Sequence, residues 1–214
     1  MKKYALLLLF TVFILYGCGG DELSTSSKDE SASITADLLG GTWTADCSDN
    51  TTASTSANTV LVFSASGDNL TATTTNYSGL NCVADNESSI FRKKLNTLVL
   101  GSKTTTSQNQ IINKFTATVT SITLEPKATS VSSSLNGAND GAGYCGLSTG
   151  WSSGTETSVA GLTCETTTYK SVGDPYKDIM QMNSEKTFIR LGNITNIDSS
   201  TGFPMTLYSK TYKK

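Results

Sequence analysis

The sequence predicts an all-β domain, an antiparallel up-and-down barrel of about eight or more strands, with a β-sandwich as the alternative. Thr and Ser are very abundant while Pro occurs only 3 times in 214 residues, and β-branched Thr suits a pleated surface. Short β-rich runs alternate with polar turns along most of the chain. No segment shows a sustained helical period, so antiparallel β structure is the expected class.

The predicted elements follow one another from residue 34 to the C-terminus. A short helical turn is expected over 34–39, with Ser33 as its N-cap, and Gly40-Gly41 ends it. Strands are then expected at 42–45, 59–63, 70–77, 90–95, 98–100, 115–124, 163–169, 179–182, 187–191 and 205–212.

Two of these regions have special features. The strand 115–124 alternates regularly, but its apolar face switches near Ser121, which predicts a β-bulge or a sheet corner. The stretch 130–154 is rich in Gly and poor in apolar residues, so we expect a long loop that carries Cys145 and Trp151.

The N-terminal residues have the pattern of an export signal. Two lysines precede an apolar, uncharged run over residues 4–16, which is shorter than the about 20 residues of a membrane-spanning helix. The run ends in Leu-Tyr-Gly-Cys at 15–18, which resembles the lipobox of bacterial lipoproteins in its Leu, Gly and Cys, while the Tyr departs from it. The resemblance implies that 1–17 is a cleaved signal peptide and that Cys18 is acylated.

The segment after the lipobox fits a membrane anchor. Residues 18–33 are polar and nearly devoid of apolar side chains, so we expect a lipidated flexible tether and a single β domain over 34–214. The resemblance implies several acyl chains on one Cys, and stable anchoring requires more than one chain. It also favours the outer membrane over the inner one, because Gly19 rather than Asp follows the Cys.

Four further cysteines lie in the predicted domain. In an oxidising compartment four cysteines form disulfides in any of three pairings, and sequence alone does not choose among them. We expect Cys47–Cys82 and Cys145–Cys164, because each pair would join neighbouring predicted strands.

The start of the first strand resembles a known barrel family. Leu38-Leu39-Gly40-Gly41-Thr42-Trp43 is similar to the opening of lipocalins and their calycin relatives, where a helical turn leads into Gly-x-Trp. The resemblance implies that Gly41 and Trp43 are structural residues at the closed end of the barrel. It also implies a basic partner for Trp43 from a late strand, and Arg190 and Lys210 are the candidates.

Several function classes lack support in the sequence. The chain has no His, which removes the commonest general base, and its net charge of −2 gives no footprint for nucleic acid. Carboxylates at Asp46 and Asp49, and at Asp85 and Glu87, stand in polar turns where such residues normally form turns. Neither 136–141 nor 198–202 has the ligand spacing of a calcium loop, so no metal, cofactor or catalytic residue is expected.

Two non-enzymatic functions remain. The first is a carrier whose barrel holds a small apolar molecule. Its candidate lining residues are Phe63, Tyr77, Phe91, Phe115 and Tyr169. The alternative is a surface module that binds another protein, as an adhesin, a scaffold or an inhibitor of a secreted enzyme, with the 130–154 loop as its binding surface. An open apolar cavity of several hundred Å³ would favour the carrier.

Overall fold

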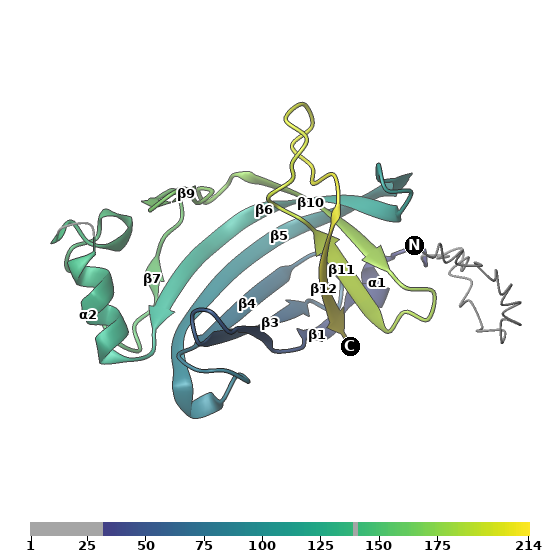
Figure 1. Cartoon of the computed structure of the whole chain (residues 1–214). Helices are drawn as coiled ribbons and strands as arrows, with labels where there is room; N and C mark the ends of the chain where they lie inside the picture. The colour runs from purple at the N-terminus through teal and green to yellow at the C-terminus, as the bar shows by residue number, and fades with distance from the viewer. Residues whose placement is uncertain (1–31, 139–140) are drawn as a thin grey trace, which may run out of the picture.

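The computed structural model describes residues 32–138 and 141–214, and its secondary structure is 49% strand and 11% helix (Figure 1). The expected signal peptide, Cys18 and most of the expected tether lie outside the described residues. In the part that the structure describes, no helix is long and apolar enough to cross a membrane.

The elements are mostly short strands. In chain order they are α1 (Ala36–Leu39), β1 (Gly41–Ala45), β2 (Ser48–Asn50), β3 (Thr55–Phe63), β4 (Leu70–Tyr77), the 3-10 helix η1 (Ala84–Asn86), β5 (Glu87–Thr105), β6 (Ile111–Pro126), α2 (Thr129–Gly137), the 3-10 helix η3 (Tyr144–Gly146), β7 (Thr157–Ser158), β8 (Thr163–Cys164), β9 (Thr167–Thr168), β10 (Pro175–Met182), β11 (Phe188–Gly192) and β12 (Leu207–Lys213).

Eight of the strands pair in a closed, barrel-like ring, in the order β1, β3, β4, β5, β6, β10, β11, β12 and back to β1. Every pairing is antiparallel, and each ring strand pairs with the next ring strand along the chain. β2 extends the sheet beside β3, and β7 lies beside β6. The predicted class, an antiparallel up-and-down ring rather than a sandwich, is therefore confirmed.

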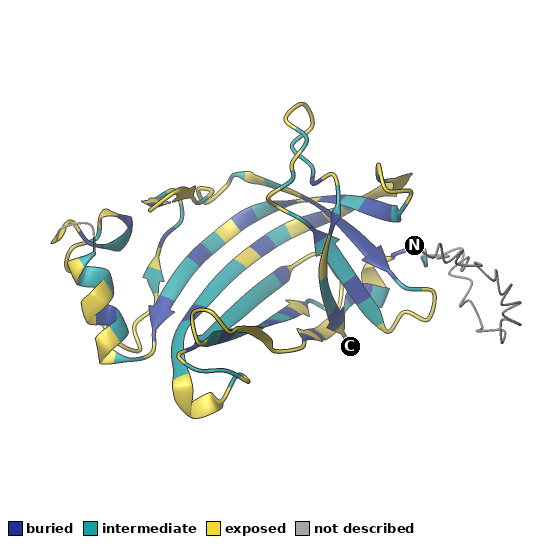
Figure 2. Cartoon of the chain, viewed as in Figure 1, coloured by how far each residue is buried: buried dark blue, intermediate teal, exposed yellow. Residues whose placement is uncertain are grey.

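The ring forms because the strands bury alternate residues. Buried and exposed positions follow one another in bands along β5 and β6 (Figure 2). The main core of apolar side chains results inside the ring, a smaller apolar cluster of Ile112, Ile179 and Leu207 lies apart from it, and most Thr side chains remain at the outer surface or edges. Successive side chains of a strand point to opposite faces, so this period is what an amphipathic sheet requires.

Several strand boundaries differ from the sequence-based ones. The predicted strands 90–95 and 98–100 are parts of one long strand, β5. The predicted strand 163–169 is instead the small hairpin of β8 and β9, which forms a sheet of its own. The predicted bulge near Ser121 is confirmed, because Lys94 pairs with Ser121 whereas Leu95 pairs with Val119, which leaves Thr120 unpaired. The N-cap of α1 is Thr35 rather than Ser33.

Trp43 lies at the end of the ring beside α1. Its side chain is fully buried, and its indole Nε1 donates a hydrogen bond of 2.7 Å to the Leu39 carbonyl at the end of α1. Gly41 has a φ of +114°, in the region that favours glycine, so β1 enters the ring through a backbone conformation that other residues adopt rarely.

The basic residue over Trp43 is Lys214, directly after β12, and both expected partners were wrong. Lys214 Nζ lies 5.1 Å from the centre of the Trp43 ring and donates to the Leu38 carbonyl. Arg190 instead donates to the Tyr208 carbonyl across β11 and β12. Lys210 lines a small surface pocket between β12 and residues 46–48. The basic partner nevertheless comes from the last strand region of the chain, because Lys214 directly follows β12.

Residues 129–169 form a cap segment at the opposite end of β5 and β6 from α1 (Figure 1). The expected loop over 130–154 is partly helical: α2 and η3 both lie within it. Trp151 is buried, and its backbone N–H and carbonyl both hydrogen-bond the Asn136 side chain. Cys145 of η3 is disulfide-bonded to Cys164 of β8, so the bond cross-links two parts of the cap segment.

Both expected disulfides are present. Cys47 and Cys82 join the start of β2 to the connection between β4 and β5, across a sequence separation of 35 residues. Cys145 and Cys164 are 19 residues apart and lie within the cap segment. Each bond should stabilise the fold by about 3 kcal/mol by restricting the unfolded chain.

Candidate functional site

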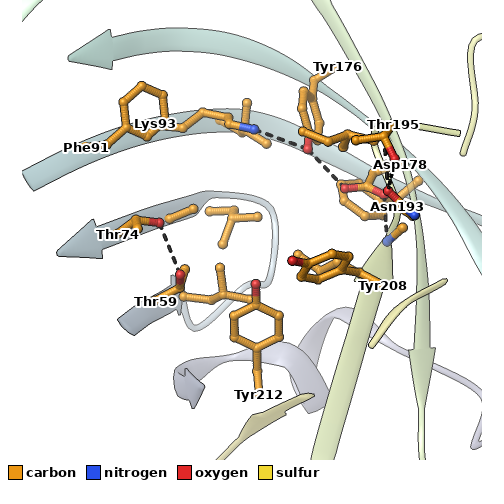
Figure 3. A pocket seen from close by; sticks show the side chains of 18 residues that line it. Thr59, Thr74, Phe91, Lys93, Tyr176, Asp178, Asn193, Thr195, Tyr208 and Tyr212 are labelled. Atoms are coloured by element: carbon orange, nitrogen blue, oxygen red, sulfur yellow. Dashed lines mark hydrogen bonds between the residues drawn. The ribbon is translucent and has the colours of Figure 1, made fainter. Parts of the chain in front are cut away.

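A cavity of about 400 Å³ lies inside the ring, and we call it the inner cavity (Figure 3). Its lining comes from β3, β4, β5, β6, β10 and β12, and from residues 191–195 at the end of β11. Most of these side chains are apolar, as in a typical small-molecule site of several hundred Å³. The ring therefore encloses space that its own side chains do not fill.

Strand alternation decides which residues face this cavity. Leu70, Ala72 and Thr74 in β4 and Phe91, Lys93 and Leu95 in β5 all line it, at every second position. The intervening residues point to the outer face, as the period of a strand requires. Lys93 is thus placed inside the ring by the register of β5.

Lys93 is the first member of a polar chain across the cavity. Its Nζ donates a hydrogen bond of 3.2 Å to the Tyr176 hydroxyl, which in turn donates one of 3.0 Å to Oδ2 of Asp178. The same ammonium lies 4.3 Å from the centre of the Tyr176 ring. Tyr176 and Asp178 are two residues apart in β10, so both point inward toward β5.

Asp178 is only 1% exposed, and the backbone holds it in place. Its Oδ1 accepts hydrogen bonds of 2.7 Å from the Ile179 N–H and 3.0 Å from the Gly192 N–H. A Cβ at Gly192 would lie 2.4 Å from this Oδ1 and 2.6 Å from Pro204. Glycine is therefore needed here for the close approach of β11 to the carboxylate.

Burial dominates the electrostatics of the polar chain. It raises the pKa of Asp178 from 3.8 to about 6, although the Ile179 N–H, the Tyr176 hydroxyl and the charge of Lys93 lower it in part. Burial also lowers the pKa of the Lys93 ammonium, which the charge of Asp178 partly offsets. The Tyr176 pKa is well above its usual value for the same reason. By exposed fraction Asp178 is buried, whereas Lys93 and Tyr176 are half-buried and face the cavity.

The cavity presents hydrogen-bonding groups that have no partner among the described residues. Lys93 has three N–H donors and uses one, on Tyr176. Tyr208 and Tyr212 of β12 direct their hydroxyls toward the same space (Figure 3), and within the described ranges neither hydroxyl is hydrogen-bonded. Asp178 by contrast accepts three hydrogen bonds. The uncommitted groups suit an oxygen-bearing ligand at Lys93.

A second cavity of about 470 Å³, the outer cavity, lies between the cap segment and the far ends of β4, β5 and β6. Leu135, Tyr144, Val159 and Tyr169 line it from the cap side. No charged residue lines this cavity, in contrast to Lys93 and Asp178 in the inner cavity.

The five aromatic residues expected to line a ligand site are divided among three environments. Phe91 and Phe115 line the inner cavity, and Phe91 also lines the outer cavity together with Tyr169. Phe63 and Tyr77 are buried in the protein and line neither cavity. Tyr169 follows β9 rather than lying within a strand.

Sequence reasoning missed Lys93, Tyr176 and Asp178. Lys93 carried a signal, because it occupies an inward position between Phe91 and Leu95, but it also stands in a run of basic residues that is typical of a solvent-exposed strand. Asp178 precedes an apolar stretch, and its partner Gly192 belongs to another strand, which the local pattern does not specify.

The carboxylates considered for catalysis serve structural contacts or stand in turns. Asp46 forms an exposed ion pair of 2.7 Å with Lys213. Asp49 accepts a hydrogen bond from the Asn81 N–H. Asp85 lies in the 3-10 helix η1, and Glu87 begins β5.

No protein-family model matches the chain, and no curated protein matches it. Across residues 32–138 and 141–214, no group of three or more His, Cys, Asp or Glu side chains is arranged to hold a metal ion. The geometry of the two cavities is therefore the basis on which a function is assigned.

Proposed function

We propose that this protein is a non-enzymatic carrier that binds a small amphiphilic molecule inside its ring of strands. The observation that carries the proposal is the inner cavity, which combines apolar sides with the partly uncommitted ammonium of Lys93. A ligand with an apolar body would replace water along the sides and gain about 25 cal/mol per Å² of apolar surface buried.

Lys93 defines the polar end of the ligand. A carboxylate or carbonyl oxygen could accept one of its free N–H groups, and such charge-assisted hydrogen bonds are worth about 1.5–3 kcal/mol. Asp178 supports this role by holding Tyr176, and through it Lys93, in a fixed position. We therefore expect an oxygen head group at Lys93.

The ring and the Trp43 arrangement support a calycin-like carrier more than a protein-binding module. A long loop over 130–154 favoured the alternative, but α2 and η3 occupy part of this stretch, and its residues Leu135 and Tyr144 line the outer cavity. The inner cavity also has the several hundred Å³ that a carrier requires.

Titration with octanoate, followed by NMR shifts of backbone amides, tests the proposal. We expect saturable shifts in residues around the inner cavity, and Lys93→Met should weaken the affinity about tenfold or more through loss of the charge-assisted hydrogen bond. Lys94→Met is the matched control, because Lys94 is the adjacent residue and is exposed. Absence of saturable binding to the wild type, or equal effects of the two variants, would contradict the proposal.

We also propose that the carrier is exported and anchored to a membrane, the outer membrane rather than the inner one, through acylation of Cys18. The support is the sequence of residues 1–18, which precede the described part of the chain. Cys18→Ser should release the protein into the soluble fraction. A variant that stays bound to membranes with the mass of the wild-type protein would overturn this proposal.

A further inference from the structure

We propose that the inner and outer cavities form one continuous binding tract for a long unbranched amphiphile. This inference rests on the proposed carrier function and specifies its ligand. The oxygen head group lies at Lys93, and the apolar chain runs past Phe91 and ends under the cap segment. A shorter amphiphile would fill the inner cavity alone.

The two cavities meet at a single cross-strand pair. Thr74 and Phe91 line both cavities, and they are direct partners in the pairing of β4 with β5. Figure 3 shows their side chains at one side of the inner cavity, away from Tyr208. The two linings therefore share this pair of side chains, and the proposed tract passes over it.

The same face of the sheet continues from one cavity into the other. Ala72 pairs with Lys93 on the inner side of the boundary, and Asn76 pairs with Ser89 on the outer side. Alternate pairs along two strands share one face and are about 7 Å apart. A chain lying on this face would contact Lys93, Phe91 and Ser89 in that order.

Phe91 contacts the cap segment directly at this boundary. Its ring centre is 5.4 Å from that of Tyr169, with the ring planes tilted by 32°. Tyr169 is partly buried, and burial raises its pKa to about 12. The two rings are in contact with each other, so the proposed apolar chain lies beside this pair and buries apolar surface against the ring of Phe91.

The distribution of charge sets the direction of the ligand. Lys93 and Asp178 line the inner cavity, while the outer cavity is lined by neutral side chains only. Its cap side consists of Leu135, Tyr144, Val159 and Tyr169. The outer cavity thus favours the apolar end, and the inner cavity favours the head group.

The test compares palmitate with octanoate by calorimetric titration of the full domain. Leu135→Trp fills the outer cavity from α2, and Ser133→Trp, on an exposed position of the same helix, is the matched control. Each methylene lost from an apolar site weakens binding about fourfold. Leu135→Trp should therefore weaken palmitate binding at least about tenfold and leave octanoate binding unchanged, while Ser133→Trp should change neither.

A second variant fills the outer cavity independently, so the test can still be made if Leu135→Trp does not fold. Ser89→Phe fills the outer cavity from β5 and should give the same selective loss of palmitate affinity. The continuous tract is refuted if the two filling variants weaken palmitate and octanoate binding equally, or if they change the affinity for neither ligand. The carrier function stands in both cases. If the wild type binds neither ligand, the carrier function itself is refuted.

Discussion

Two lysine–aromatic pairs occupy different surroundings in this ring. Beside α1, Lys214 lies over Trp43. The buried indole N–H donates to the Leu39 carbonyl, and the exposed ammonium donates to the Leu38 carbonyl and can direct its other N–H groups to solvent. In the inner cavity, Lys93 lies over Tyr176 and keeps two N–H donors without a partner among the described residues. Trp43 belongs to the core, whereas the Tyr176 pair places the ammonium of Lys93 at the inner cavity.

The same lysine–aromatic contact thus has a structural role at Trp43 and a proposed ligand-binding role at Tyr176. Buried polar groups are normally hydrogen-bonded, because an unpaired one costs about 1–3 kcal/mol. At the Trp43 site the buried indole N–H meets this rule, and the ammonium of Lys214 is exposed to solvent. Lys93 is half-buried and faces the inner cavity, where a ligand oxygen could accept the N–H groups that Tyr176 does not.

The largest effect should follow from removing the structural aromatic residue. Trp43→Ala deletes a fully buried side chain and should lower the free energy of unfolding by about 3–5 kcal/mol, measured by chemical denaturation. Tyr212→Phe is the control, because it removes a hydroxyl without a partner in the described structure, and its effect should stay within about 0.5 kcal/mol. Equal midpoints for wild type and Trp43→Ala would show that the Trp43 site is not a core.

An intermediate effect should appear as a pH dependence at Asp178. The folded protein raises this pKa from 3.8 to about 6, so it binds the proton more tightly than the unfolded chain does. Wild-type stability should then fall as the pH rises between these values, and Asp178→Asn lacks this contribution. Relative to the variant, the wild type should lose about 2 kcal/mol of unfolding free energy between pH 4 and pH 7.5.

Denaturation curves of both proteins across that pH range give the difference directly. Asp198→Asn is a control of opposite sign, because hydrogen bonds from Ser200 and Thr201 lower the pKa of this exposed carboxyl to about 2. A wild-type advantage over Asp178→Asn that grows with pH would mean that the charge of Lys93 and the hydrogen bonds to Asp178 outweigh its burial.

The smallest effect is expected for the lysine over Trp43. Lys214→Ala removes an exposed cation–π contact and should cost about 0.5–1 kcal/mol in thermal or chemical denaturation. Lys210→Ala, at one of the two positions expected from the sequence, should cost less because Lys214 rather than Lys210 lies over Trp43. The reverse order would restore Lys210 as the partner.

The Trp43 site and the strand pattern could be predicted from the sequence. Trp43 belongs to a local motif, and the strand runs follow a period of two that needs no knowledge of distant partners. The disulfide pairs were predicted correctly because each joins cysteines that follow one another along the chain, although only Cys164 lies within a strand. Local pattern therefore sufficed for the antiparallel class and for the core at Trp43.

The place of Lys93 in the inner cavity could not be predicted in the same way. Lys93 is flanked by Arg92 and Lys94, so the composition of the run indicates a solvent-exposed strand, and only the register of β5 directs Lys93 inward. The helix α2 was missed because its residues are mainly Ser, Asn and Gly, which have modest helix propensity. Its tertiary contacts and the nearby disulfide provide the support that local propensity lacks.

A crystal structure of the protein with palmitate tests the central claim most directly. We expect a carboxylate oxygen within hydrogen-bond distance of Lys93 Nζ and an acyl chain that runs past Phe91 into the outer cavity. Continuous density from Lys93 to Leu135 would support both the carrier function and the single tract. Palmitate bound only on the outer surface, with both cavities holding water, would contradict the carrier function and the continuous tract.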